Sequence, residues 1–384
     1  MGTPFEDDTA ESADPRPESL DAVFDLRETR HQGERVLYFG ESLVPEQMLI
    51  REVWPAFRDA GYEIEAARID PSGRDVLVAR PLSTGIDGIP WTNLGLLLAT
   101  VSTTLFVGAT VWYYIPAHEL LADPLLALQA WPFVAAVLGV LLVHELGHYV
   151  AGRYHGVDVS LPYVIPFVVP FGTMGALIRV RGQLPDREAL FDVGVAGPLA
   201  GLAATIVVTT IGLSLPPQQV PAAVVQSTGE AIVFNDPPLL RLIATALGEP
   251  TSYQDPRTTV HPVVVGGWVG MFFTLLNLLP VGQLDGGHIL RAIVGPRQET
   301  IAALVPLGLF GLAGYLHVVR GLGLNDSVAL WLFWGLFATA LAYNGPADPI
   351  DDTALDRRRI AIGVGTFLLG SLCFMLIPVQ VVSV

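Results

Sequence analysis

Lysine is absent from this 384-residue chain, and a single cysteine, Cys373, is present. All 21 basic residues are therefore arginines, set against 37 acidic residues and a formal net charge of −16 at pH 7. One cysteine excludes a disulfide framework within the chain and a zinc site built from cysteines. The acidic balance argues against nucleic acid as a partner, because phosphate groups and a carboxylate-rich surface repel each other.

An acidic, lysine-free composition is typical of proteins from salt-loving archaea, in which dense carboxylates keep the surface hydrated at high salt. We therefore expect an archaeal halophile as the source. This composition concerns habitat and not activity, and it leaves the oligomeric state open.

Charged residues are also few, at 15% of the chain, whereas 51% of residues are hydrophobic and the mean hydropathy is +0.51. Such a chain is too apolar for one soluble core. Apolar runs long enough to cross about 30 Å of hydrocarbon recur along it, which predicts a polytopic α-helical membrane protein with about six to seven transmembrane helices. The candidate runs are Leu94–Ile115, Trp131–Gly152, Val193–Leu215, Val263–Leu284, Thr300–Leu316, Ser327–Tyr343 and Ile360–Val381.

Three regions are expected along the chain. Residues 1–20 are acidic and predict a disordered tail, and Met1–Ser19 has neither the basic nor the apolar region of a signal peptide. Residues 21–85 mix strand-like and helical patterns and predict a small soluble α+β domain, in which Pro55 argues for a break within the helix. Residues 86–384 form the predicted membrane-embedded domain.

Arginine placement sets the expected orientation, because loops rich in arginine favour the cytoplasm. Arginines gather after the second run, after the fourth run and before the seventh. We therefore predict a multi-pass cell-membrane protein whose N-terminal domain and active-site opening lie on the cytoplasmic side. The arginines concerned are Arg153, Arg179, Arg181, Arg187, Arg291, Arg297, Arg357, Arg358 and Arg359.

The stretch VLLVHELGHYVAGRYHG contains the pattern HExxH, formed by His144, Glu145 and His148. Four-residue spacing places both imidazoles on one helix face, where they can hold one Zn²⁺, and Glu145 can reach a water beside the metal. The alternative is a polar helix end facing the cytoplasm. Because Pro124–Val143 carries no charge and ionisable groups are costly in such a run, we predict a metal site.

A catalytic zinc needs three protein ligands and an open position. The run GWVGMFFTLLNLLPVGQLDGGHILRA offers Asp285 near its end, whereas the segment directly after HExxH offers no carboxylate. The alternative role for Asp285 is that of a cap or turn residue in LDGG. For His155 and His288 we expect surface or supporting roles, and for Gly197 and Gly201 a small-residue face that packs helices.

Residues 160–180 are apolar and rich in proline and glycine, so they cannot form an uninterrupted helix. We predict a re-entrant hairpin packed inside the protein, because irregular backbone is not tolerated against lipid. Its edge can pair with an unwound substrate by strand addition, with Gly172, Thr173, Met174 and Gly175 as predicted substrate contacts. The alternative is a connector that only fills the bundle.

HELGH at 144–148 and NLLPVGQLDGGH at 277–288, in this order, resemble the site-2 protease family of intramembrane zinc metalloproteases. The resemblance is to the branch without a PDZ insert, which includes archaeal, cyanobacterial and plastid members. It implies one Zn²⁺ per chain, held by His144, His148 and Asp285, with Glu145 as general base. It also implies Asn277 as an amide donor to the developing oxyanion; the alternative role for Asn277 is a hydrogen bond between helices.

The resemblance predicts regulated intramembrane proteolysis, in which peptide bonds within or near transmembrane segments of other membrane proteins are hydrolysed in the bilayer. Zinc would lower the pKa of its bound water toward about 7, and Glu145 would accept the proton. A metal-ion transporter is an alternative, but it would need ionisable residues in several runs, and the other runs are nearly free of them. An inactive relative that binds membrane proteins would be expected to have lost Glu145 or a ligand.

Overall fold

The structure is a computed structural model that describes residues 16–383 except 69–74, 83–87, 169 and 227–229. The tail predicted over residues 1–20 therefore lies, as far as residue 15, outside the described residues. Contacts divide the chain into two units, Met1–Gly85 and Ile86–Val384.

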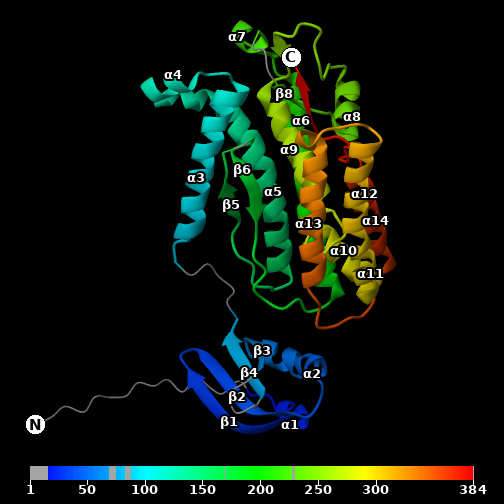
Figure 1. The fold of residues 1–384 in the computed structure, drawn as a ribbon. Helices are drawn as coiled ribbons and strands as arrows, with labels where there is room; N and C mark the ends of the chain where they lie inside the picture. Colours follow the sequence, from blue (N-terminus) through cyan, green and yellow to red (C-terminus); the bar gives the residue numbers. More distant parts are fainter. Residues whose placement is uncertain (1–15, 69–74, 83–87, 169, 227–229, 384) are drawn as a thin grey trace, which may run out of the picture. The chain divides into compact units, whose positions relative to one another are not determined.

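The N-terminal unit is a four-stranded antiparallel sheet with one long helix, in the strand order β1-β2-β4-β3 (Figure 1). Alternate strand residues such as Tyr38, Ile64 and Leu77 are fully buried together with Phe57 of α2. The predicted break at Pro55 is wrong: α2 continues through it, because burial of one helix face outweighs the missing hydrogen bond. The elements are α1 (Leu20–Val23), β1 (Phe24–Gln32), β2 (Arg35–Ser42), α2 (Glu46–Asp59), β3 (Tyr62–Arg68) and β4 (Asp75–Pro81).

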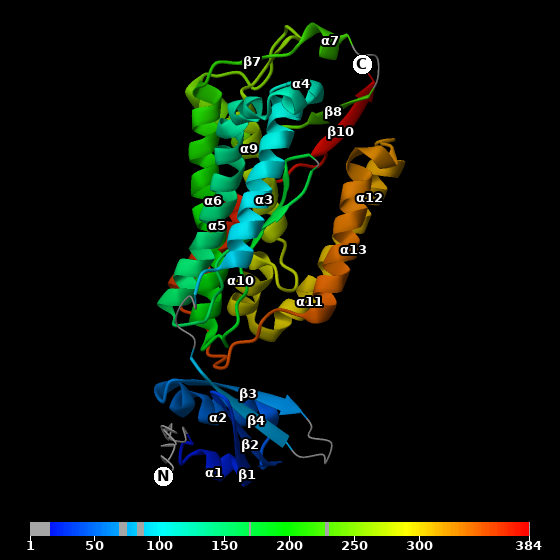
Figure 2. The same ribbon diagram turned by 90° about the vertical axis from the view of Figure 1, so that its left-hand side faces the viewer.

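The described residues of the C-terminal unit form apolar helices (Figure 2) and three short two-stranded sheets. Its helices are α3 (Trp91–Val107), η1 (Gly108–Trp112), α4 (Ala117–Ala122), η2 (Pro124–Ala130), α5 (Trp131–Tyr154), α6 (Arg187–Ser214), α7 (Ala222–Val225), α8 (Pro238–Leu247), α9 (Pro262–Asn277), α10 (Asp285–Val294), η3 (Gly295–Arg297), α11 (Gln298–Ala302), α12 (Leu304–Val318), η4 (Leu324–Val328), α13 (Ala329–Asn344) and α14 (Arg357–Ser371). Its strands are β5 (Tyr163–Pro166), β6 (Thr173–Leu177), β7 (Gln218–Gln219), β8 (Glu230–Phe234), β9 (Thr258–Thr259) and β10 (Val379–Ser383).

Among the described residues, four helical stretches are long and apolar enough to cross a membrane, or five if the bent pair Asp285–Ala302 and Leu304–Val318 is one span. This agrees with a helical membrane protein, although these lengths do not reproduce about six to seven spans. The fourth predicted run contains only the 16-residue helix α9, and the seventh contains the 15-residue helix α14. At 1.5 Å per residue, helices of this length reach only about 22–24 Å. The four stretches are Trp91–Trp112, Pro124–Tyr154, Arg187–Ser214 and Leu324–Asn344.

Strands β5 and β6 form an antiparallel hairpin inside the segment predicted to be re-entrant. Helix α3 donates side-chain hydrogen bonds to carbonyl groups of this segment. Thr100 Oγ1 lies 3.0 Å from the Val164 oxygen, and Thr103 Oγ1 lies 2.7 Å from the Gly172 oxygen. These contacts satisfy carbonyl groups that lipid would leave without a partner.

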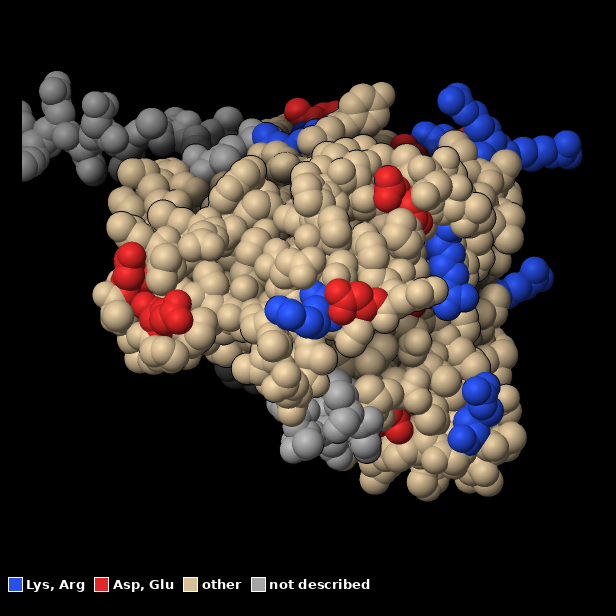
Figure 3. Space-filling view, turned by 90° about the horizontal axis from the view of Figure 1, so that it is seen from above, with Lys and Arg blue, Asp and Glu red and all other residues tan. Residues whose placement is uncertain are grey.

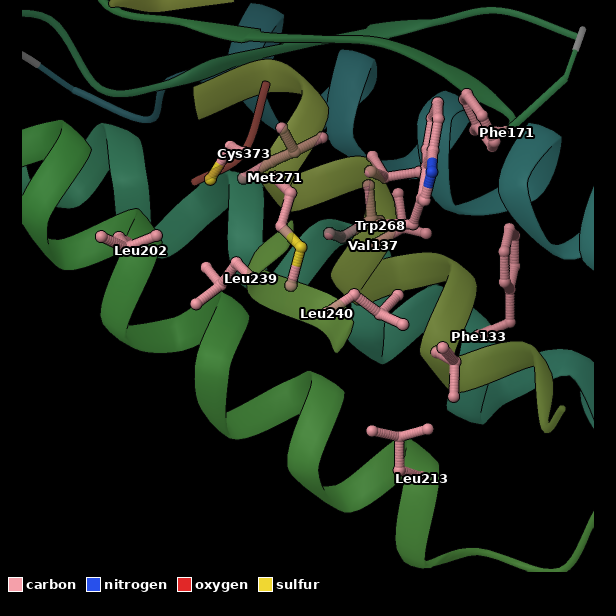
Figure 4. Packing of buried hydrophobic residues seen from close by; sticks show 14 of the residues in the cluster. Phe133, Val137, Phe171, Leu202, Leu213, Leu239, Leu240, Trp268, Met271 and Cys373 are labelled. Atoms are coloured by element: carbon pink, nitrogen blue, oxygen red, sulfur yellow. The ribbon is translucent and has the colours of Figure 1, made fainter. Parts of the chain in front are cut away.

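The largest apolar core joins α5, α6, α8 and α9 to the tip of the hairpin (Figure 4). Phe133 and Val137 of α5 are fully buried, as is Met271 of α9. Phe171 at the hairpin tip stacks on Trp112, with ring planes 9° apart. This core fixes α5 and the hairpin relative to each other, and these two elements border the site described below.

Strand β10 pairs with β8 and is also anchored to the start of η4. Asp326 accepts a hydrogen bond from the Val381 N–H at 2.8 Å, and the Ser327 hydroxyl donates to the Val379 carbonyl oxygen. Figure 3 views the molecule from the end that carries α4 and α7, where charged side chains are few and scattered. Backbone pairing with β8 and the two side chains of η4 therefore hold β10 in place.

Candidate metal centre

Helix α5 carries the HExxH residues in its C-terminal half, among apolar residues. His144, Glu145 and His148 are each only 5% exposed. The helix runs unbroken from Trp131 to Tyr154, so the four-residue spacing does place both imidazoles on one face.

Asp285 is the first residue of α10, and it reaches the histidines by a different route from the one expected. The fourth run does not end at Asp285: helix α9 stops at Asn277, and residues 278–284 form a loop before α10 begins. A Cβ at Gly286 would overlap the Leu278 carbonyl oxygen, and one at Gly287 would overlap the Gly282 oxygen. The two glycines of LDGG therefore allow the loop to fold back tightly against the start of α10.

The three predicted ligands lie together, with one ligand atom of each within 4.8 Å of the others. Asp285 Oδ2 is 3.0 Å from His144 Nε2, Asp285 Oδ1 is 3.2 Å from His148 Nε2, and the two Nε2 atoms are 3.1 Å apart. Tetrahedral zinc with bonds of about 2.0–2.1 Å separates its ligand atoms by about 3.3 Å. The donor set of two imidazoles and one carboxylate thus fits zinc in both chemistry and spacing.

A hydrogen bond of the second ring nitrogen of His148 determines which nitrogen is available to a metal. His148 Nδ1 lies 2.7 Å from the Val193 carbonyl oxygen of α6. A carbonyl can only accept, so Nδ1 carries the hydrogen and Nε2 keeps its lone pair for a metal. Residue types alone could not predict this contact, because every residue has a backbone carbonyl.

Two glycines of α6 make room for the two imidazoles. A Cβ at Gly197 would overlap the His148 ring, and a Cβ at Gly201 would lie 2.7 Å from His144 Nδ1. The predicted packing face is therefore also the wall of the metal centre. The equal four-residue spacing of the glycines and the histidines was the available signal for this pairing.

Three further residues for which the sequence predicted roles lie at different positions relative to the ligands. Asn277 Nδ2 lies 3.2 Å from His144 Nε2, so the amide borders the ligand cluster. His155 Nε2 lies 2.9 Å from Asp192 Oδ2, which makes it a surface partner of α6. His288 lines the cavity described next but is not among the grouped ligands.

A cavity of about 660 Å³ opens onto the centre. Its lining includes Glu145, His148 and Asp285 together with Asn277. One side is a continuous stretch of chain that leaves the hairpin, residues 176–184. Buried ligands and an open, chain-lined cavity together give a centre that a substrate can reach.

The hairpin meets this cavity after its second strand and not at its tip. Ile178, the first residue after β6, lines the cavity together with Glu145. Gly172, Thr173, Met174 and Gly175 are not among the residues that line the cavity in the described part of the chain. Thr173 is buried, and its hydroxyl lies 2.9 Å from the Ile165 oxygen and 3.0 Å from the Gly175 nitrogen, so it stabilises the turn.

A cluster of ion pairs holds α10 against the start of α6. Asp352 Oδ1 accepts from Arg187 Nε at 2.6 Å and from Arg291 Nη1 at 2.9 Å. Arg291 belongs to α10, the helix that begins with Asp285. The Arg187 hydrogen bond, aided by Arg291, holds the pKa of Asp352 below its ordinary value of 3.8.

Comparisons with known proteins find similarity to peptidases. Residues 132–312 match the model of peptidase family M50. A protein of Arabidopsis thaliana described as "Probable zinc metalloprotease EGY1, chloroplastic" is 36% identical over 196 residues, which cover 50% of this chain and 35% of the relative. A protein of Oryza sativa subsp. japonica with the same description is 32% identical over 243 residues, 62% of this chain and 40% of the relative.

A third relative, "Probable zinc metalloprotease EGY2, chloroplastic" of Arabidopsis thaliana, is 29% identical over 241 residues. The matches to these three relatives span between about a third and two fifths of their lengths. The matched family segment contains both HELGH and Asp285, and no PDZ insert is evident in the described residues.

The contact between Gly197 and His148 yields a first prediction. Gly197→Ala should displace the His148 ring and weaken zinc binding about 10- to 100-fold, as changes to ligand-orienting groups do. Zinc content of the purified protein, measured at a series of buffered zinc concentrations, checks this. Gly139→Ala is the matched control, because a Cβ there would meet nothing within 4 Å. Equal zinc affinity in the two variants would contradict the assigned contact.

The Asp352 cluster yields a second prediction, about pH. A pKa that folding lowers contributes stability above the ordinary pKa and loses it as pH falls through the folded value. Asp352→Asn should therefore lower Tm at neutral pH, and its difference from the unchanged protein should shrink below about pH 3.8. Thermal unfolding in detergent between pH 3 and 7 measures this. The control is Asp236→Asn, since Asp236 forms no ion pair with any described residue. A pH-independent difference would refute it.

Proposed function

Residues 132–312 of this chain belong to peptidase family M50, the site-2 proteases, and we propose that the chain is an intramembrane zinc endopeptidase. The predicted family, the zinc metalloprotease class and the zinc cofactor are confirmed. The proposal extends them to the reaction: hydrolysis of peptide bonds within or near transmembrane segments of other membrane proteins.

One observation carries the proposal: two histidines and a glutamate of an apolar helix long enough to cross a membrane meet an aspartate of α10 beside a cavity. His144 and His148 lie on α5, within the apolar stretch Pro124–Tyr154. Glu145 is not used as a ligand in this arrangement and lines the cavity instead. A structural zinc site has four protein ligands, whereas the group found among the described residues has three, the number typical of a catalytic zinc.

Each residue then has a role that follows from its position. Zinc bound by His144, His148 and Asp285 would supply Lewis-acid activation of water and of the substrate carbonyl. Glu145 faces the same cavity and accepts the proton of the attacking water, then returns it to the leaving amine. The Val193 carbonyl keeps the His148 ring in the required tautomer throughout.

Asn277 is placed to help the same step. Its amide nitrogen lies beside His144 at 3.2 Å and lines the cavity. An amide N–H donor at this position would stabilise negative charge that develops on the carbonyl oxygen during attack.

The substrate needs an extended backbone, because a helix hides its peptide bonds. The Arg179 N–H donates to the Ser160 hydroxyl, and the Arg179 carbonyl accepts from the Ser160 N–H. In an extended chain the backbone groups of the neighbouring residues Ile178 and Val180 therefore face the opposite edge. Ile178 and Val180 both line the cavity that contains Glu145. We therefore place strand addition at residues 176–180, in place of the predicted contacts at 172–175.

The setting of the reaction is also part of the proposal. The substrate is a transmembrane protein in the lipid bilayer, and the cavity opens on the cytoplasmic side, as the arginine-rich loops favour. The relatives named above are described as chloroplastic, which is a statement about those proteins.

The role of Glu145 gives a third prediction. Glu145→Gln keeps the shape of the side chain but cannot take a proton, so cleavage of a single-span model substrate in liposomes should fall at least about 10²- to 10⁴-fold. Bound zinc, measured by metal analysis, should stay near one per chain. Undiminished cleavage would end the proposed mechanism.

The role of Asp285 gives a fourth prediction. Asp285→Ala removes the third ligand, so zinc content after exposure to a chelator should fall well below that of the unchanged protein. Asp236→Asn serves as a matched control and should retain its zinc. If Asp285→Ala retained zinc equally well, this carboxylate would not belong to the ligand set.

A further inference from the structure

Two arginines lie on the wall of the cavity that opens onto the metal centre. Arg179 and Arg181 follow β6 directly, and both are exposed. They belong to residues 176–184, the stretch of chain that lines this cavity together with Glu145. The mechanism uses neither guanidinium.

Neither arginine is neutralised by the protein. No carboxylate of the described residues forms an ion pair with Arg179 or Arg181, in a chain with 37 acidic and 21 basic residues. The Arg179 guanidinium instead lies over the Tyr163 ring, 5.5 Å from its centroid. By contrast, the nearby buried Arg187 and Arg291 each pair with an aspartate.

The acidic side chains on the cavity wall already have partners or roles in the reaction. Asp348 accepts a hydrogen bond from Arg291 Nε at 2.9 Å. Glu145 and Asp285 belong to the reactive centre itself. The charge that remains available to an incoming molecule along this wall is therefore positive.

The strand geometry sets how far this charge lies from the reaction. Beyond β6 the chain is bridged at Val180 to Val159, and an extended chain rises about 3.3 Å per residue, so Arg181 is about 10 Å along the chain from Ile178, which lines the cavity with Glu145. A substrate paired with this edge would advance by the same rise. Its side chains about two to four residues from the cleaved bond would then reach the guanidinium groups.

We propose that Arg179 and Arg181 bind carboxylate side chains of the substrate, about two to four residues from the cleaved bond. This specificity rests on the proposed proteolytic function and narrows it: the preferred substrates carry Asp or Glu where the unwound segment leaves the membrane. Guanidinium groups suit this task, because they remain charged and donate paired hydrogen bonds to a carboxylate. An anionic lipid headgroup offers related chemistry, but the arginines lie on the cavity wall beside the reactive residues, which favours the substrate chain.

The test compares single-span substrates that carry Asp, Asn or Lys at successive positions on both sides of the cleaved bond, in liposomes of zwitterionic lipid. We expect kcat/KM to be about 3-fold higher for Asp than for Asn at one or two positions, the size typical of exposed ion pairs. Arg179→Gln and Arg181→Gln should each reduce this Asp-to-Asn ratio, and the double variant should bring it to about 1. Arg181→Glu should prefer Lys over Asp at the same position.

Arg297→Gln is the matched control, since Arg297 is also exposed and forms no ion pair with described residues but does not line the cavity. It should leave the Asp-to-Asn ratio unchanged. An equal loss with Arg297→Gln, or a ratio of 1 in the unchanged protein, overturns the proposal. So does an arginine effect that follows the anionic lipid content of the vesicles and not the substrate charge.

Binding separates this inference from the proposed reaction. In the Glu145→Gln background, the affinity for the same substrates is measured without turnover. A preference for Asp that Arg179→Gln and Arg181→Gln abolish would support the inference even if no substrate were cleaved, and only the proposed reaction would then fail. Cleavage of every substrate with no charge preference in rate or binding would refute the inference alone.

Discussion

The close approach of α5 and α6 is the contact on which the metal centre depends. His144 faces Gly201 and His148 faces Gly197, so the imidazoles occupy space that any side chain on α6 would fill. Lipid is as apolar as the helices, and small residues that permit close packing are therefore what draws such helices together. The same contact brings the Val193 carbonyl to His148. The packing of these two helices therefore also orients the two histidine ligands.

The third ligand depends on polar contacts outside the apolar core. Asp285 stands at the start of α10, and Arg291, on the same helix, shares Asp352 with Arg187 of α6. The loop that supplies Asp352 lies between α13 and α14. Helices that are distant in the sequence thus fix both ends of α10, and the carboxylate meets the imidazoles at 3.0–3.2 Å.

The sequence predicted the chemistry of the centre better than its architecture. HExxH on an apolar helix and a distant Asp285 are local signals with few alternatives, and the chain does bring these residues together. Apolar runs, however, do not mark where helices stop: Val263–Leu284 contains a helix end at Asn277 and then a loop. Backbone contacts, such as that of the Val193 carbonyl with His148, leave no trace in residue type. At Pro55 the sequence predicted a helix break that is absent, because packing of α2 outweighs the low helix propensity of proline.

The anchoring of η4 by β10 has a consequence for how the protein is made. Asp326 and Ser327 receive their partners from a strand that follows them by more than 50 residues, after α13 and α14. During synthesis, α12 and α13 can therefore enter the membrane before the end of α13 at η4 has its final neighbours. The membrane unit completes this end last, when the chain beyond α14 pairs with β8. The position of Asp285 likewise depends on residues that are synthesised later, because Asp352, which binds Arg291 of α10, follows α13.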